Sequence, residues 1–104
     1  MIRAVLGSAF SAVLPAAAQE TGYVPPNGFV TNAPTAISIA RAVLTPIYGV
    51  KVIQNEEPLT ATRQGDVWTV KGMLCPRRNN CLRGTAELRL SATDGRVLFV
   101  THYK

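Results

Sequence analysis

The side chains best suited to making specific contacts lie in one short segment of the C-terminal half. Two cysteines separated by five residues enclose adjacent arginines and asparagines, and a further arginine follows closely. Cysteines this close commonly pair in an oxidising compartment, and a closed polar loop loses less entropy on binding. Guanidinium groups also make bidentate contacts with carboxylates. We therefore expect a disulfide and a partner-binding surface, with two free buried thiols and a solvated loop as the alternatives. The disulfide would join Cys75 to Cys81, and the surface would comprise Arg77, Arg78, Asn79, Asn80 and Arg83.

The remaining reactive side chains do not form a catalytic pattern. Glu56 and Glu57 are adjacent, and neighbouring side chains of an extended segment point to opposite sides, which predicts a solvated acidic turn. His102 is the single histidine, and both an edge-capping role and a binding role are open to it. No spacing sets a nucleophile beside a base, and no glycine-rich loop leads into a helix to hold phosphate. Zinc needs about four ligands at suitable spacing. The sequence predicts no enzyme, no metal site and no cofactor.

The first 18 residues have the layout of a secretory leader. A short basic start is followed by an apolar run, a proline and three alanines, which predicts cleavage between Ala18 and Gln19. The apolar run is about half of what a helix needs to cross a bilayer. We therefore expect residues 1–18 to be a signal peptide and the product to be periplasmic or secreted, without stable membrane insertion. An uncleaved anchor is the alternative.

The charge balance favours an acidic protein partner. The chain has 104 residues, with 11 Lys and Arg against 6 Asp and Glu, which gives a net charge of +5. Such an excess speeds encounter with a surface of opposite potential. The arginines are not interleaved with stacking aromatics, so the sequence does not predict nucleic-acid binding.

The periodicity predicts one helix after a tether. Residues 19–33 contain Pro25-Pro26 and Asn27-Gly28 without apolar periodicity, as is typical of an extended tether lying outside or along the fold. From Pro34 or Thr35, apolar residues recur at three- and four-residue steps. Pro46 removes a helical hydrogen bond, so we expect the helix to kink or stop near Leu44. Gly49 would then close a distorted last turn.

The sequence beyond Gly49 predicts strands. Segments 50–54, 59–63, 67–74, 85–92 and 96–103 have short apolar or alternating patterns, and turn residues at 64–66 and 93–95 mark hairpins. Trp68 shares a strand face with Val70, which favours a core position under the helix over an exposed interface anchor. The predicted fold class is α+β: within residues 34–104, one N-terminal amphipathic helix packs on a curved antiparallel sheet of four to five strands.

Several phrases of the chain, taken in order, resemble a known family. They are Pro46-Ile47-Tyr48-Gly49, Glu57-Pro58-Leu59, Val67-Trp68-Thr69-Val70-Lys71-Gly72, Asp94-Gly95-Arg96-Val97-Leu98, and His102 before Lys104. The chain from Thr35 to Lys104 resembles the immunity proteins with a nuclear transport factor 2-like, or cystatin-like, fold that are found beside bacterial polymorphic toxins. The resemblance implies a small, non-catalytic protein that binds and neutralises a cognate toxin, on a reduced fold whose N-terminal helices are replaced by the tether. The residues that carry this fold signature are Tyr48, Gly49, Trp68, Gly72, Asp94, Gly95 and His102.

Two other functions are compatible with parts of the chain. Glu87 to Val100 resembles the small exported peptidase propeptide and YpeB domains, which implies peptidase inhibition or envelope regulation. Such domains carry two helices, each leading into a hairpin. An enzyme on a cone-shaped fold is the third possibility, and it would need a deep pocket lined by Asp or Glu together with Tyr.

Overall fold

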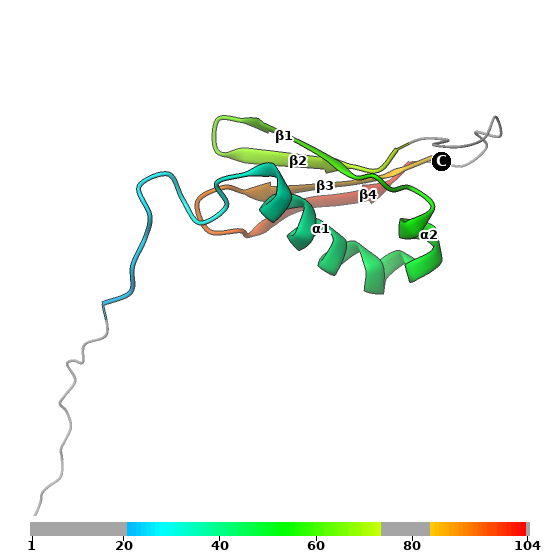
Figure 1. Ribbon diagram of the computed structural model, residues 1–104, viewed down its shortest axis with the longest axis horizontal. Coiled ribbons are helices and arrows are strands. Elements are labelled where there is room, and N and C mark those ends of the chain that lie inside the picture. The colour runs from blue at the N-terminus through cyan, green and yellow to red at the C-terminus, as the bar shows by residue number, and fades with distance from the viewer. Residues whose placement is uncertain (1–20, 74–83, 104) are drawn as a thin grey trace, which may run out of the picture.

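The computed structural model describes residues 21–73 and 84–103. Two helices precede four strands: α1 (Ala33–Tyr48), α2 (Val50–Gln54), β1 (Thr60–Gln64), β2 (Val67–Lys71), β3 (Ala86–Ser91) and β4 (Val97–His102). The strands form one antiparallel sheet in the order β1-β2-β3-β4, so each pairs with its neighbour in sequence. Both helices lie on the same side of this sheet (Figure 1). This arrangement confirms the predicted α+β class, with four strands.

Helix α1 begins with a side-chain cap and presents small residues to the sheet. The Oδ1 atom of Asn32 accepts hydrogen bonds from the backbone N–H and the hydroxyl of Thr35, at 2.9 and 2.8 Å. Ala36, Ala40 and Leu44, each four residues after the last, are fully buried. The two alanines let the helix backbone approach the sheet closely.

Pro46 does not stop α1, so of the two predicted outcomes, a kink or a stop near Leu44, the stop was wrong. The helix continues to Tyr48 with the proline inside it. Pro46 lies in the last turn, where only one helical hydrogen bond is lost. The helical hydrogen-bond pattern is present again at Gly49, whose N–H donates to the carbonyl of Thr45 at 2.8 Å.

Residues 50–54 form the short helix α2, not a strand as predicted. Gly49 adopts a φ of +102° between the two helices, a backbone angle that favours glycine. The N–H of Ile53 donates to the carbonyl of Gly49, and that of Asn55 donates to Lys51. Five residues are too few for periodicity to separate helix from strand, and the β-branched residues of this segment favoured the wrong choice.

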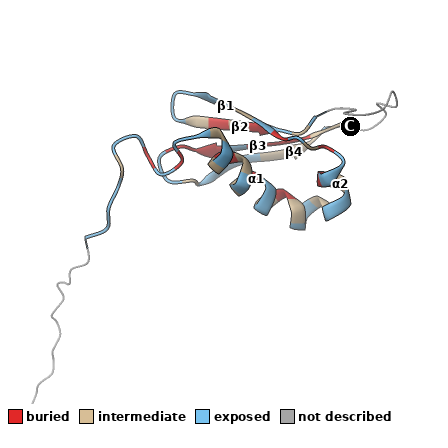
Figure 2. Ribbon diagram, viewed as in Figure 1, coloured by how far each residue is buried: buried red, intermediate tan, exposed pale blue. Residues whose placement is uncertain are grey.

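The core lies between α1 and the covered face of the sheet (Figure 2). Trp68 and Val70 of β2 and Leu88 and Leu90 of β3 are buried there. The exposed fraction of Trp68 is 7%, and its Nε1–H donates to the backbone carbonyl of Val30 at 2.8 Å. The prediction that Trp68 is a core residue is confirmed.

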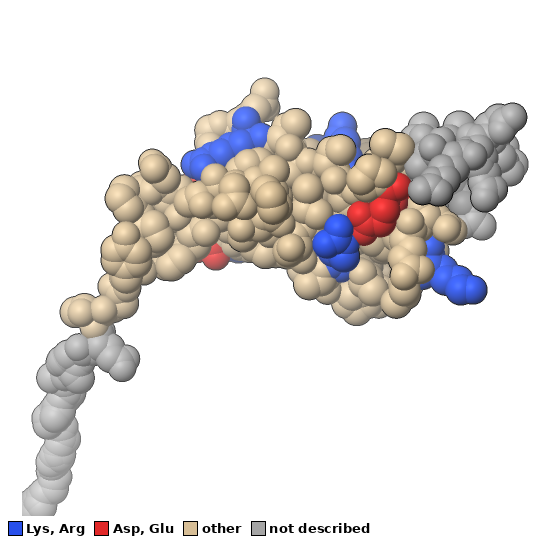
Figure 3. Space-filling view, in the orientation of Figure 1, with Lys and Arg blue, Asp and Glu red and all other residues tan. Residues whose placement is uncertain are grey.

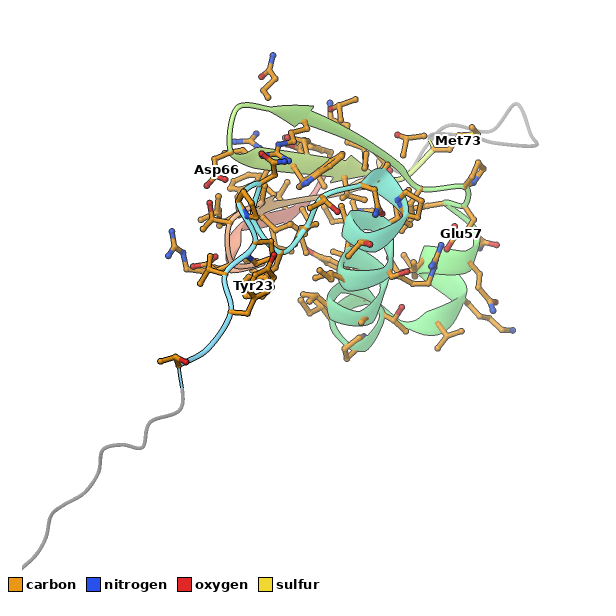
Figure 4. The ribbon with its side chains drawn as sticks, turned by 60° about the vertical axis from the view of Figure 1, so that its left-hand side comes forward. Tyr23, Glu57, Asp66 and Met73 are labelled. Atoms are coloured by element: carbon orange, nitrogen blue, oxygen red, sulfur yellow. The ribbon has the colours of Figure 1, made fainter. Side chains whose placement is uncertain are left out.

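The residues just before α1 dock on the sheet. The N–H groups of Phe29 and Val30 donate to the carbonyls of Thr93 and Ala92, both at 3.0 Å, and Val30 is buried in the core. The tether therefore lies along the fold here, beside the turn between β3 and β4. Figure 4 shows Tyr23 at the same end of the sheet as Asp66, opposite the end that carries Glu57 and Met73.

Within the described residues, no helix combines the length and apolarity needed to cross a membrane.

Candidate functional site

The predicted partner-binding loop cannot be placed from the structure. Cys75, Cys81 and the polar residues Arg77, Arg78, Asn79, Asn80 and Arg83 all lie outside the described residues, and their roles stay predictions. Across residues 21–73 and 84–103, no three His, Cys, Asp or Glu side chains gather closely enough to hold a metal ion.

Glu56 is a buried anchor, not part of a solvated acidic turn as predicted. Its exposed fraction is 7%. One carboxylate oxygen, Oε1, accepts hydrogen bonds from the backbone N–H of Ala86 at 2.8 Å and from the Thr85 hydroxyl at 3.0 Å. The other, Oε2, lies 2.8 Å from Nε2 of His102. The backbone carbonyl of Glu56 also accepts from the N–H of Met73 at 2.7 Å. The carboxylate thus joins the segment after α2 to β3 and β4.

The signature residues His102 and Gly72 lie against this carboxylate, and Tyr48 lies against His102. The rings of Tyr48 and His102 lie 5.1 Å apart between centroids. A Cβ atom on Gly72 would lie 2.3 Å from Oε1 of Glu56 and 2.5 Å from the Thr85 hydroxyl, so any larger residue would displace the Glu56 side chain. We call Tyr48, Glu56, Gly72, Thr85 and His102 the Glu56 cluster. This cluster gives His102 a structural contact. The sequence clue to the cluster was Gly72, because a glycine at the end of a strand often marks a close approach of another part of the chain.

A second polar anchor lies at the opposite end of the sheet. Asp66, in the turn between β1 and β2, accepts hydrogen bonds from the hydroxyls of Thr93 and Ser91 at 2.7 and 3.3 Å. Its backbone carbonyl accepts from the N–H of Ala92 at 2.8 Å. Asp66 therefore fastens the first hairpin to the second.

The turn between β3 and β4 is closed by its own residues. Gly95 has a φ of +77°, and Oδ1 of Asp94 accepts from the N–H of Arg96 at 3.0 Å. This backbone hydrogen bond is the main reason that the pKa of Asp94 is lowered from its ordinary value. The signature residues Asp94 and Gly95 thus have a turn-forming role.

Glu57 faces away from its neighbour and pairs with α1. Its two carboxylate oxygens lie 2.7 Å from Nε and 3.1 Å from Nη2 of Arg41, and the N–H of Leu59 donates to the same carboxylate at 3.2 Å. The hydrogen bond from Arg41 is the largest cause of the lowered pKa of Glu57, and it raises the pKa of Arg41. The expectation that the two glutamates point to opposite sides is met, but neither is a free surface carboxylate.

A third carboxylate, Glu87, lies on the sheet face away from the helices. It accepts hydrogen bonds from Nε of Arg89 at 2.8 Å and from the Tyr103 hydroxyl at 3.0 Å. Burial alone would raise the pKa of Glu87, but these two hydrogen bonds and the charges of Arg89 and Lys71 lower it overall. The bond to Glu87 raises the pKa of Tyr103. The guanidinium carbon of Arg89 also lies 4.4 Å from the ring centroid of Phe99.

The lowered pKa of Glu87 makes stability depend on pH. A carboxyl whose pKa is lower in the folded state contributes stability above its unfolded pKa, and the contribution is lost as pH falls through the folded pKa. We expect Glu87→Gln to lower the free energy of unfolding at pH 7 and to reduce its decline on acidification. Urea unfolding between pH 7 and pH 3 measures both.

Tyr103→Phe is the matched variant for this test. It removes one of the two hydrogen bonds to Glu87 and leaves the carboxyl in place. The decline on acidification should therefore be intermediate between that of the wild type and that of Glu87→Gln. Equal declines in all three proteins would show that Glu87 does not carry this pH dependence.

The described carboxylates are thus all engaged in holding the fold together. Glu57, Glu87 and Asp94 pair with arginines and Glu56 with His102, while Asp66 binds hydroxyls. Within the described part of the chain, Lys51, Arg63 and Lys71 form no ion pair. Figure 3 shows basic side chains spread over one face of the molecule, not gathered in a single patch. The basic side chains that could bind a partner are therefore scattered over the surface, and the described carboxylates hold the fold together.

One helix packed against an open antiparallel sheet, with a polar anchor at each end, defines a small α+β domain of the nuclear transport factor 2-like class. Residues 35–104 match the family described as NTF2 fold immunity protein, and the chain belongs to this family. The match runs from α1 to the last residue and confirms the resemblance found in the sequence. Searches of curated proteins and of solved structures found no match.

Proposed function

We propose that this protein is an immunity protein that binds a cognate toxin and neutralises it without catalysis. The observation that carries the proposal is the family match over residues 35–104, which covers α1 from Thr35 onward, α2 and all four strands. Family membership supports a toxin-immunity role.

The chemistry of the chain supports binding as the mode of action. The described carboxylates hold elements of the fold together, while the chain as a whole carries a net charge of +5. A basic inhibitor is steered towards an acidic surface on its target. The arginine-bearing loop predicted from the sequence would supply bidentate contacts at that surface.

We also propose that the protein acts outside the cytoplasm. The leader pattern of residues 1–18 supports export to the periplasm or the medium. Toxins delivered by neighbouring cells would be met there. Peptide sequencing of the N-terminus of the protein isolated from the cell envelope would establish whether cleavage occurs after Ala18.

Genetics gives the sharpest test of immunity. We expect deletion of this gene to be tolerated only when the adjacent toxin gene is also deleted. The single deletion should lose in co-culture with toxin-proficient kin, and a plasmid copy should restore growth. Healthy growth of the single deletion among such kin would contradict the proposal.

The partner-binding loop needs a separate biochemical test. The toxin from that locus, purified in an inactive form, would be titrated with the full chain at low salt. Replacing Arg77, Arg78 and Arg83 by alanine should weaken binding by tenfold or more, because each loses a charge contact. Lys51→Ala, on α2, is the control and should leave affinity close to that of the wild type. Unchanged affinity in the triple variant would exclude the loop as the contact surface.

A further inference from the structure

Strand β4 (Val97–His102) has an unusual character for the edge of a sheet. Val97, Leu98 and Phe99 are 40%, 44% and 39% exposed, and the strand contains no Lys, Arg, Asp, Glu or Pro. Exposed edges usually carry charges or proline, which prevent pairing with another chain. The opposite edge, β1, follows this rule, because it consists of polar residues and one alanine and includes Arg63. The two edges of one sheet are therefore built differently.

The edge of β4 is open within the described residues. β4 is the last strand in the sheet order and pairs with β3 alone. Helix α1 lies over β1, β2 and β3, so β4 extends beyond the part of the sheet that the helix covers. Val97, Leu98 and Phe99 are left partly in solvent, with Phe99 beside Arg89 on the sheet face away from the helices.

The register shows which backbone groups point outward. The N–H of Tyr103 donates to the carbonyl of Thr85. In an antiparallel ladder, bonded and non-bonded pairs alternate. Thr101 and Phe99 therefore exchange hydrogen bonds with Glu87 and Arg89, their partners in β3. The N–H and C=O groups of Val100 and His102 point away from the sheet, where another strand can pair with them.

Among the described residues, the charged side chains beside β4 pair with one another. Arg89 pairs with Glu87 at 2.8 Å and Arg96 with Asp94 at 3.3 Å. The strand itself contains no Lys, Arg, Asp or Glu, and its His102 contacts Glu56. A neutral apolar edge gives no electrostatic attraction to an acidic partner. It also gives no repulsion to a second copy, although the whole chain carries a net charge of +5.

We propose that β4 is a self-association edge, on which a second copy of this chain pairs its own β4 in antiparallel orientation. A two-fold axis would relate the copies, and the two sheets would become continuous. The outward groups of Val100 and His102 would then be hydrogen-bonded, and the exposed apolar side chains of the two strands would contact one another across the new pair. This proposal does not depend on the identity of a toxin.

The test is the mass of the full chain in solution. Sedimentation velocity from low micromolar to several hundred micromolar protein should show a monomer converting to a dimer. Leu98→Lys adds a charge to the β4 edge and should raise the dimer dissociation constant at least tenfold. Thr62→Lys adds the same charge to an exposed position of β1 and is the control, which should leave the dissociation constant near the wild-type value.

Hydrogen exchange provides a second measurement. The amides of Val100 and His102 should become more protected as protein concentration rises, whereas those of β1 should not. If Leu98→Lys does not fold, as judged by its thermal unfolding, Val97→Lys replaces it. A monomer at all concentrations, or equal weakening by the β4 and β1 lysines, would overturn the proposal. Protection of β4 that appears only on addition of the toxin would also overturn it and would assign this edge to the toxin.

Discussion

Replacing Glu56 with alanine is expected to lower the free energy of unfolding by about 3 kcal/mol, because it removes one member of a buried, hydrogen-bonded pair. The variant leaves the N–H of Ala86 without its acceptor and deprives His102 of its carboxylate partner. It also opens space beside Gly72, which the Glu56 side chain fills. Domains of this size are marginally stable, commonly by about 5–15 kcal/mol, so the loss would be a large share of the total.

The adjacent glutamate provides the matched control. Glu57→Ala removes a partly exposed ion pair with Arg41, whose side chain is 46% exposed, and such pairs contribute about 0–1 kcal/mol. Urea unfolding of both variants at pH 7 compares the same substitution at neighbouring positions. Equal losses would contradict the assignment of Glu56 as the anchor. Glu56→Gln keeps an acceptor for Ala86 and should fall between the wild type and Glu56→Ala.

Gly28→Ala is expected to release the segment before α1 from the sheet, at a cost of about 2 kcal/mol or more. Gly28 has a φ of +87°, which side chains with a Cβ rarely adopt. An added Cβ would also lie 2.3 Å from the carbonyl oxygen of Ala92, and this contact is with backbone that cannot rotate away. Val30, two residues later, would lose its position in the core.

Trp68 reports directly on this change. It is the single tryptophan of the chain, and its indole N–H donates to the carbonyl of Val30. We expect its fluorescence emission to shift to longer wavelength in Gly28→Ala as water reaches the ring. Gly22→Ala is the control, because no atom lies within 4 Å of the added Cβ, and its emission and stability should match those of the wild type. Wild-type emission in Gly28→Ala would show that the docked segment tolerates the change.

The helix and the sheet could be predicted because their patterns are long and regular. Buried residues recur at regular steps in α1 (Ala36, Ala40, Leu44) and in β3 (Ala86, Leu88, Leu90), and Gly65 and Gly95 mark the hairpin turns. Residues 50–54 offered no such repetition. Pro46 favoured an end of the helix near Leu44. Because Pro46 lies in the last turn, the helix continues past it to Tyr48.

The Glu56 cluster could not be predicted from spacing. Its members come from the end of α1, the segment after α2, the residue after β2, the residue before β3 and the last strand, and only the folded sheet brings them together. Adjacent glutamates before a proline are usually solvated, so composition favoured the wrong environment for Glu56. The fold signature located Tyr48, Gly72 and His102, but it did not indicate the carboxylate of the cluster.

The order of the strands also has a consequence for how the chain folds. Every strand pairs with the one beside it in sequence, and the β1–β2 and β3–β4 hairpins close through turns of a few residues. Topologies dominated by local contacts fold fast. The hydrogen bond between Val30 and Ala92 instead joins residues from opposite ends of the described chain, and its closure carries the larger entropic cost. We therefore expect the contact between Val30 and Ala92 to form last in folding and to break first when the protein is heated or exposed to denaturant. A protease would then reach the segment ahead of α1 before it reaches the sheet.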